Sequence, residues 1–320
     1  MSYTCACCGE TFENESMGEY DVHGFWVCDS CIDSDYTRCE DCDELVPDDE
    51  VEEVNGHYYC SCCAESHNYE NNGICNYHAH HSADPIFYGD IENNAHPYLG
   101  VELEVDMGGY YDDVADEVKN IMGYDFIYQE SDGSIDDGFE NITQPATLKY
   151  HESKEDDYHK MFRYLVHNGY RSHNTRTCGL HVHFNRSFFD NKDEYIENLL
   201  YIMDKFWNEM SKFSRRTSNR LNEWAKKHEK TPTEIIADMH NHNETRYYAI
   251  NLTNNDTIEF RMFRGTLNPN SFFATLEMVD NIVTKAKYCT KEELENMTFD
   301  DLLTTDRLKA YWETVKNRAV

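Results

Sequence analysis

The sequence has few basic residues, and they are unevenly distributed. Lys and Arg number 28 against 61 Asp and Glu, which gives a formal net charge of −33. Among residues 1–118, Arg38 is the only Lys or Arg. Because contacts with DNA phosphates require basic side chains, this composition argues against duplex nucleic acid as the main partner. The acidic N-terminal third either provides solubility, the reading we favour, or docks on a basic surface of a protein partner.

Long apolar runs and a secretory leader are also missing. No segment approaches the roughly 18 consecutive apolar residues that a membrane-spanning helix requires, and the N-terminus lacks the apolar core of a leader peptide. We therefore expect a soluble, cytoplasmic protein without a membrane partner. The length of 320 residues accommodates a catalytic domain of roughly 200 residues and a smaller module.

Cysteine is nearly confined to the start of the chain, where ten of the 13 lie before residue 64. Clustered cysteines in a chain without a leader favour metal binding over disulfides. Eight of them form four Cys-x2-Cys pairs, the spacing of tetrahedral zinc sites. Taken in sequence order, the pairs predict two zinc ions, one on Cys5, Cys8, Cys28 and Cys31 and one on Cys39, Cys42, Cys60 and Cys63. Because all the ligands are thiols, no coordination position stays open, and we expect structural zinc.

The cysteine pairs lie in an internal repeat that defines the predicted domains. Residues 1–66 read as two similar halves, each with a pair on a turn, an acidic loop and a hairpin that carries the second pair. This arrangement resembles tandem zinc ribbons or a LIM-like pair, and we expect a protein partner for this module. Residues 67–97 read as a linker, in which Cys75, His78, His80 and His81 either indicate a third metal or, the reading we favour, are incidental. Residues 98–320 are the predicted catalytic domain.

Three segments of that domain alternate apolar side chains with carboxylate, imidazole or guanidinium groups. Such alternation predicts strands that pack one face on a core and present the other to solvent or a cavity. The segments are 100–105 with Glu102 and Glu104, 179–184 with His181 and His183, and 257–264 with Glu259 and Arg261. Together they predict one sheet with a metal-ligand face, which we interpret as the active site.

Three other features of this domain have two interpretations each. Glu140 follows a turn at 130–134 and lies either on a buried strand or at the surface. The basic cluster at 212–227 either guides an anionic substrate or forms a solvated helix face, and we favour the solvated face. Arg264 falls on the wrong face of a regular strand unless a bulge turns it. Residues 246–252 and 257–264 predict a hairpin, because 253–256 has the composition of a turn.

Taken together, these motifs resemble the amidoligase family of phage and bacterial genomes, a branch of the glutamine synthetase superfamily of carboxylate-amine ligases. The resemblance covers roughly residues 85–285. It rests on the 99–104 strand, the Asp-Gly-Ser motif at 132–134 with Glu140, the 178–183 strand and the 257–267 segment. It implies an α+β fold with a curved antiparallel sheet flanked by helices. The N-terminal domain of glutamine synthetase has no counterpart, so oligomeric state and substrate do not transfer.

The resemblance also implies cofactors and residue roles. It implies ATP with Mg²⁺ or Mn²⁺, held by the ligand set Glu102, Glu104, Glu140, His181 and Glu259. Arg261 would contact phosphate, and His183, Arg264 and Arg246 would assist. The expected reaction joins a carboxylate, peptide or protein included, to an amine through an acyl phosphate.

The residues themselves are compatible with this chemistry, because divalent ions on carboxylates and a nearby arginine reduce repulsion between a carboxylate and ATP. Two alternatives are a metal-dependent hydrolase, which needs no ATP, and a zinc-ribbon adaptor with an inactive enzyme domain. Arg261 beside Glu259 argues against the hydrolase, and the filled ligand positions argue against the inactive domain.

Overall fold

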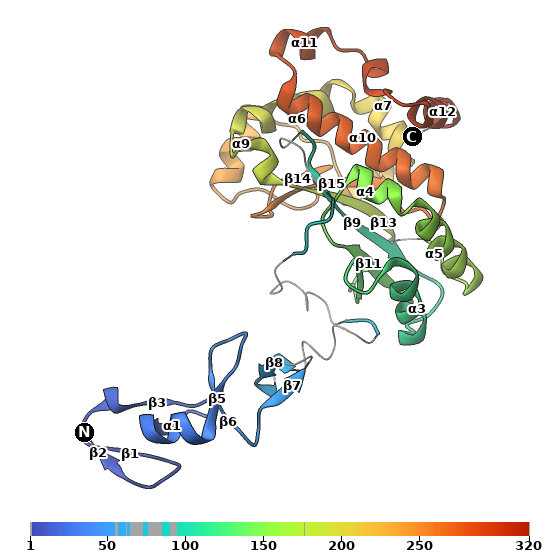
Figure 1. The fold of residues 1–320 in the computed structure, drawn as a ribbon. Helices are drawn as coiled ribbons and strands as arrows, with labels where there is room; N and C mark the ends of the chain where they lie inside the picture. Colours follow the sequence, from blue (N-terminus) through green and yellow to red (C-terminus); the bar gives the residue numbers. More distant parts are fainter. Residues whose placement is uncertain are drawn as a thin grey trace. The chain divides into compact units, whose positions relative to one another are not determined.

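The computed structural model describes residues 2–54, 57–61, 63–64, 73–75, 85–89, 95–175 and 177–319 (Figure 1). The chain divides into two compact units, residues 1–72 and residues 73–320. The second unit thus starts within the segment predicted as a linker. No helix in the described part of the chain is both long and apolar enough to cross a membrane.

The N-terminal unit consists of short antiparallel hairpins and one helix. The hairpins are β1 (Tyr3–Thr4) with β2 (Thr11–Phe12), β3 (Gly18–Tyr20) with β4 (Trp26–Cys28), β5 (Tyr36–Arg38) with β6 (Leu45–Pro47), and β7 (Glu52–Val54) with β8 (His57–Tyr59). The 3-10 helix η1 (Glu15–Met17) precedes β3, and α1 (Asp29–Asp35) follows β4. Two small buried clusters, each built around predicted zinc-binding cysteines, form its interior.

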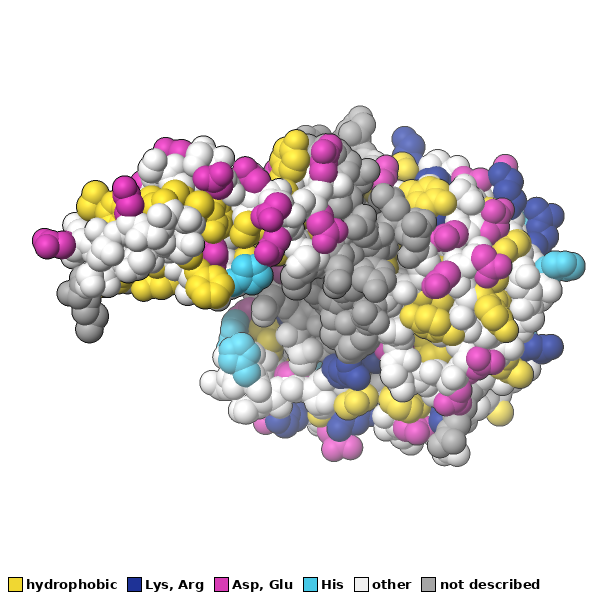
Figure 2. All heavy atoms as spheres, turned by 90° about the horizontal axis from the view of Figure 1, so that it is seen from below, with side chains coloured by type: hydrophobic (Ala, Val, Ile, Leu, Met, Phe, Trp, Pro, Cys, Tyr) yellow, Lys and Arg dark blue, Asp and Glu magenta, His cyan; other side chains and the backbone are white. Residues whose placement is uncertain are grey.

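The surface of this unit is acidic, with apolar side chains among the carboxylates. Its face in Figure 2 shows Asp and Glu side chains beside hydrophobic ones. Met17, Tyr20 and Phe25 are among its exposed large apolar residues. Arg38 donates two hydrogen bonds to the Glu19 carboxylate, at 2.8 and 2.7 Å. The only Lys or Arg of this unit is therefore already paired with a carboxylate.

The C-terminal unit is built on a seven-stranded antiparallel sheet, so a mixed helix and sheet fold is confirmed. The strand order is β10-β11-β9-β13-β15-β14, and β12 also pairs with β9. The strands are β9 (Tyr98–Val105), β10 (Ile127–Glu130), β11 (Phe139–Thr143), β12 (Ala146–Thr147), β13 (Gly179–Asn185), β14 (Ile250–Asn251) and β15 (Thr257–Arg264). The hairpin of β14 and β15 is present, although β14 is shorter than 246–252.

Helices cover the apolar face of this sheet and provide the rest of the core (Figure 1). They are α3 (Asp112–Met122), α4 (Leu148–Ser153), α5 (Glu155–His167), α6 (Asp193–Lys205), α7 (Trp207–Ser214), α8 (Ser218–Trp224), α9 (Pro232–His240), α10 (Pro269–Tyr288), α11 (Lys291–Asn296) and α12 (Asp306–Val315). The short 3-10 helix η3 (Arg186–Phe189) lies between β13 and α6, and η4 (Phe299–Leu302) lies between α11 and α12. Leu103, Val182 and Phe260 are each 2% exposed or less, as the alternation of apolar residues predicts. The opposite face remains for the polar side chains.

A β-bulge interrupts the pairing of β13 with β15. Leu180 lies opposite Phe263 and Val182 lies opposite Phe260, so β15 has one residue more than β13 between these pairs. Arg261 and Met262 together face His181. The extra residue shifts the alternation of β15, and Phe263, three positions after Phe260, is buried in the same core. Arg264 consequently points away from the core, which fulfils the condition under which it could assist Arg261.

Candidate functional site

The predicted zinc-binding cysteines assemble into two groups of four. Cys5, Cys8, Cys28 and Cys31 form the first group, and Cys39, Cys42, Cys60 and Cys63 form the second. The sulfurs of Cys8 and Cys28 are 3.9 Å apart, as are those of Cys42 and Cys60. Zinc–sulfur bonds of about 2.3 Å in a tetrahedron separate the sulfurs by roughly 3.8 Å. Each group is therefore able to hold a zinc ion.

Backbone amides favour the thiolate form at both groups. Burial raises the pKa of the Cys5 thiol, but N–H groups of Cys28, Cys8 and Cys7 outweigh burial and bring the pKa to about 6. The Cys39 thiol has a pKa of about 7, because hydrogen bonds from neighbouring backbone N–H groups likewise outweigh burial. Zinc binds thiolates, so this environment suits a metal ligand. A further group of Cys7, Cys31 and Asp35 lies beside the first.

The polar face of the large sheet brings together ligands from four strands. Glu104 lies opposite Glu140 in the pairing of β9 with β11, and Glu102 lies opposite His181 in the pairing of β9 with β13. His183 lies opposite Glu259 in the pairing of β13 with β15. Glu140, on β11, is 6% exposed, so the buried-strand interpretation of this residue is correct. Neighbouring strands run about 4.8 Å apart, which places these groups within reach of shared ions.

Two groups of ligand atoms share Glu102. One group is Glu102, Glu140 and His181, and the other is Glu102, His183 and Glu259, with atoms within 4.8 Å of one another in each. The Glu102 carboxylate is 3.1 Å from His181 Nδ1 and 2.9 Å from His183 Nε2. The Glu259 carboxylate lies 3.5 Å from His181 Nδ1 and 3.9 Å from His183 Nε2. The side chain of Glu102 therefore connects the two groups.

The crowding of carboxylates has a clear electrostatic cost. Burial and the carboxylates of Glu102, Glu104, Asp132 and Glu130 raise the pKa of Glu140 well above its usual range. Burial lowers the pKa of His183, but Glu102 and Glu259 outweigh burial and raise it to about 9. Repulsion among buried carboxylates is what a bound divalent cation relieves.

Glu104 differs from the other predicted ligands, because it belongs to neither group of ligand atoms. Its carboxylate accepts a hydrogen bond from the backbone N–H of Gly179. Burial raises the pKa of Glu104, while His181 and the Arg216 guanidinium act in the opposite direction. Glu104 therefore orients the start of β13 and neutralises a buried arginine in this structure. Its role as a metal ligand remains a prediction.

Arg261 and Asn251 hold the Glu259 carboxylate from two sides. Arg261 Nη1 donates to Glu259 Oε1 at 2.6 Å, and Asn251 Nδ2 donates to Glu259 Oε2 at 2.7 Å. Asn251 lies opposite Glu259 in the pairing of β14 with β15. Thr257 Oγ1 plays the same part for His183, with its oxygen 3.1 Å from His183 Nδ1. Sequence reasoning missed both supporting residues, although the hairpin turn at 253–256 could have indicated Asn251.

The basic cluster does not form one solvated helix face. Helix α7 ends at Ser214, and Arg215 has a left-handed backbone with φ of 64° that redirects the chain into α8. Arg216 is only 8% exposed, and its Nε donates to the carbonyl of Phe263 at 3.1 Å. The interpretation as a solvated face is therefore wrong for Arg216. Sequence reasoning noticed the charge but not that the chain turns inward there.

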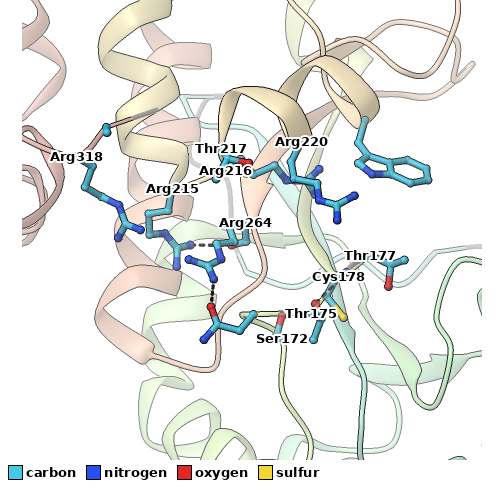
Figure 3. A pocket seen from close by; sticks show the side chains of 13 residues that line it. Ser172, Thr175, Thr177, Cys178, Arg215, Arg216, Thr217, Arg220, Arg264 and Arg318 are labelled. Atoms are coloured by element: carbon cyan, nitrogen blue, oxygen red, sulfur yellow. Dashed lines mark hydrogen bonds between the residues drawn. The ribbon is translucent and has the colours of Figure 1, made fainter.

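The structure separates the remaining two predicted arginines. Arg264 donates to the Asn174 side chain and lines a pocket with Arg215 and Arg216 (Figure 3). Arg246 is exposed, and its guanidinium lies 5.5 Å from the ring centroid of Tyr247. The structure thus joins Arg261 to the acidic groups, Arg264 to the pocket and Arg246 to the surface. Catalytic roles for the three stay predictions.

Comparison with known proteins agrees with this geometry. Residues 147–283 match a protein-family model described as "Putative amidoligase enzyme". The matched segment contains β13 and β15 with both histidines, Glu259 and Arg261, whereas Glu102, Glu104 and Glu140 precede it. The match supports the amidoligase family and a ligase-type function. No curated protein matches the chain.

Proposed function

We propose that this protein is an ATP-dependent carboxylate-amine ligase that activates a carboxylate as an acyl phosphate. One observation carries the proposal: two groups of carboxylate and imidazole ligands share Glu102 on one sheet face, beside Arg261. The amidoligase match of residues 147–283 supports the same class of reaction.

The ligand groups fit divalent cations such as Mg²⁺ or Mn²⁺. Carboxylate oxygens are hard ligands that suit both ions, and imidazole suits Mn²⁺ as well. The raised pKa of Glu140, caused by burial and surrounding carboxylates, is the environment that a divalent ion stabilises. Glu102, Glu140, His181, His183 and Glu259 would hold the ions. Bound there, the ions would supply positive charge for the phosphates of ATP.

The side chains provide the remaining functions. The reaction begins when an oxygen of the substrate carboxylate attacks the γ-phosphorus of ATP and the bond to ADP breaks. Arg261, held by Glu259 at 2.6 Å, is positioned to place its guanidinium against the oxygens that gain charge. The amine nitrogen then attacks the acyl carbon, loses its proton and releases phosphate. The products are an amide or peptide bond, ADP and phosphate.

The two cysteine groups would serve a structural role with zinc. Each group consists of four thiols, so a bound zinc ion would have no open position for a substrate. We propose that the acidic N-terminal unit holds its fold through zinc and presents a surface for a protein partner or a protein substrate.

ATP turnover by the full chain tests the proposed function. The assay follows ADP release with Mg²⁺ or Mn²⁺ across a panel of carboxylates and amines, including peptides. ADP release that requires both a carboxylate and an amine is the expected result. The Glu102→Gln variant should lose this activity because it removes charge from both groups. Product release without ATP would establish the hydrolase alternative, and a folded protein that binds neither nucleotide nor divalent ion would establish the adaptor alternative.

A further inference from the structure

A cavity of about 220 Å³ lies where β13 begins and β15 ends (Figure 3). Among the described residues, five arginines line it: Arg215, Arg216, Arg220, Arg264 and Arg318. Ser172, Asn174 and threonines add hydroxyl and amide groups to the lining. No Asp or Glu of the described residues contributes to it, although the chain has 61 of them. The composition of the cavity is thus the reverse of the composition of the chain.

Part of the positive charge of the cavity lacks a carboxylate partner. In the described part of the chain, only Arg220 among these five pairs with a carboxylate, Glu223, at 2.6 Å. Arg215 Nη2 instead donates to the carbonyl of Arg264 at 2.8 Å. Glu104 offsets the charge of the buried Arg216, whereas the half-buried Arg215 and Arg264 have no carboxylate partner in that part of the chain. An anionic ligand would stabilise these two guanidinium groups.

Hydroxyl groups in the lining also lack partners. Ser172 is fully buried, and its Oγ has no hydrogen-bond partner among the described residues. Thr177 Oγ1 is likewise buried without one in that part of the structure. A buried hydroxyl normally forms a hydrogen bond, and the oxygens of an anion would accept from both. The cavity therefore combines positive charge with unused donors.

Arg216 connects this cavity to the metal-ligand groups. A Cβ atom at Gly179 would stand 2.4 Å from Arg216 Nη2 and 2.7 Å from His181 Nε2. The absence of a side chain at Gly179 thus allows a cavity arginine and a metal-ligand histidine to approach the same point. A ligand anchored in the cavity can extend past Gly179 toward the ligand groups.

We propose that the cavity binds a second carboxylate of the acyl substrate, so that this substrate is a dicarboxylate or an acidic peptide end. This inference rests on the proposed ligase function. The cavity is below the roughly 300 to 1,000 Å³ of pockets that enclose whole ligands, which suits one carboxylate and a few carbons. The phosphates of ATP bind next to divalent ions. None of the carboxylates that form the metal-ligand groups lines the cavity, so we assign the cavity to the acyl substrate and not to ATP.

Calorimetric titration of the full zinc-loaded chain tests the proposal with succinate, glutarate and adipate. Each acid is compared with its monoamide, in the presence of Mg²⁺ and the non-hydrolysable ATP analogue adenylyl imidodiphosphate. At least one diacid should bind tenfold more tightly than its monoamide, since the monoamide loses one anchored carboxylate. Arg264→Gln and Arg318→Gln should each weaken that diacid at least tenfold. Arg163→Gln, an exposed change on α5, should leave its affinity unchanged.

The same variants separate a carboxylate site from a phosphate site. Arg318→Gln should change the affinity for the ATP analogue less than twofold. A tenfold loss of analogue affinity with no loss of diacid affinity would overturn the proposal and assign the arginines to ATP. Failure of all three diacids to bind would overturn it as well. If the analogue does not bind at all, the ligase proposal fails, and titration of the diacids without nucleotide still decides whether the arginines hold a carboxylate.

Discussion

The two candidate metal regions of this chain differ in how their ligands relate to the core of each unit. In the N-terminal unit, cysteine sulfurs make up much of two small buried clusters, so the ligands are themselves the core. In the C-terminal unit, Glu and His ligands project from the polar face of a sheet whose other face belongs to one large apolar core. Metal ions should therefore determine whether the first unit folds, and only what the second unit can bind.

The chemistry of the ligands follows the same division. Four thiols complete the tetrahedral coordination of zinc and exclude substrate, whereas three carboxylate and imidazole groups around an octahedral ion such as Mg²⁺ leave positions for water or phosphate. A closed site stabilises a fold, and an open site is available for a reaction.

The largest effect should come from the first cysteine group. Cys28→Ser removes a ligand that is 3% exposed, and should lower the zinc content from two ions to one per chain. Structural zinc contributes about 10 to 16 kcal/mol in small zinc domains, so the hairpins around this group should unfold. Metal analysis and proteolysis of the full chain measure this change.

Cys7→Ser is the matched control, because Cys7 is exposed and lies outside both groups of four. It should retain two zinc ions, and both variants should keep the unfolding transition of the C-terminal unit. A Cys28→Ser protein with two bound zinc ions would contradict the ligand assignment.

Arg261→Lys should have the next largest effect, and mainly on turnover. Lysine retains the charge but lacks the planar fork that holds two phosphate oxygens. We expect a loss of about 2 to 4 kcal/mol of transition-state stabilisation, with a smaller change in ATP binding. Steady-state kinetics and nucleotide titration provide the comparison, with Arg163→Lys as control. Unchanged turnover would remove Arg261 from the reaction.

The fold of the C-terminal unit should depend on a buried histidine that binds no metal. His151 Nδ1 lies 2.9 Å from the Tyr158 hydroxyl and Nε2 lies 3.0 Å from the Leu99 carbonyl. Burial lowers the pKa of His151 from 6.5 to about 4. Below pH 6.5 the unfolded chain therefore binds a proton at His151, whereas the folded chain binds it only below about pH 4. Lowering the pH from 7 to 5 thus reduces the free energy of unfolding by about 2 kcal/mol.

A variant without His151 isolates this contribution. His151→Gln should be less stable than the parent at pH 7, and the difference should shrink by about 2 kcal/mol at pH 5. Denaturant unfolding at both pH values measures the difference. A pH-independent difference for His151→Gln would show that the folded protein accepts the proton.

The smallest effect should come from Glu259→Gln, which keeps the shape of the side chain and removes its charge. Because Glu259 belongs to the second ligand group, the concentration of Mg²⁺ for half-maximal activity should rise on the order of tenfold, about 1.4 kcal/mol. The free energy of unfolding without Mg²⁺ should change little. Glu292→Gln, exposed on α11, is the control. An unchanged requirement for metal would exclude Glu259 as a ligand.

Local patterns predicted much of this architecture from the sequence. Side chains in strands alternate with a period of two, so each of the three segments revealed which residues share a face. The Cys-x2-Cys spacing likewise predicted both cysteine groups. What alternation cannot predict is which residues lie opposite one another, such as Glu102 and His181, because register depends on the whole sheet.

Local patterns also leave open the surroundings of single residues, because distant segments determine them. Glu104 looked equivalent to Glu102, yet the N–H of Gly179 occupies one of its oxygens. Arg216 looked like part of an exposed helix, yet the left-handed turn at Arg215 directs the chain inward. Both outcomes depend on tertiary packing, which overrides local propensity.

The bulge in β15 gives one position of this strand an unusual tolerance to deletion. Phe260 and Phe263 pack in the same core although they are three positions apart. Loss of Met262 would remove the extra residue and restore strict alternation, with Phe263 still in the core and Arg264 still on the polar face. A deletion elsewhere in the strand would instead move the residues on one side of it to the opposite face. Deletion scanning should therefore find Met262 the most permissive position of β15.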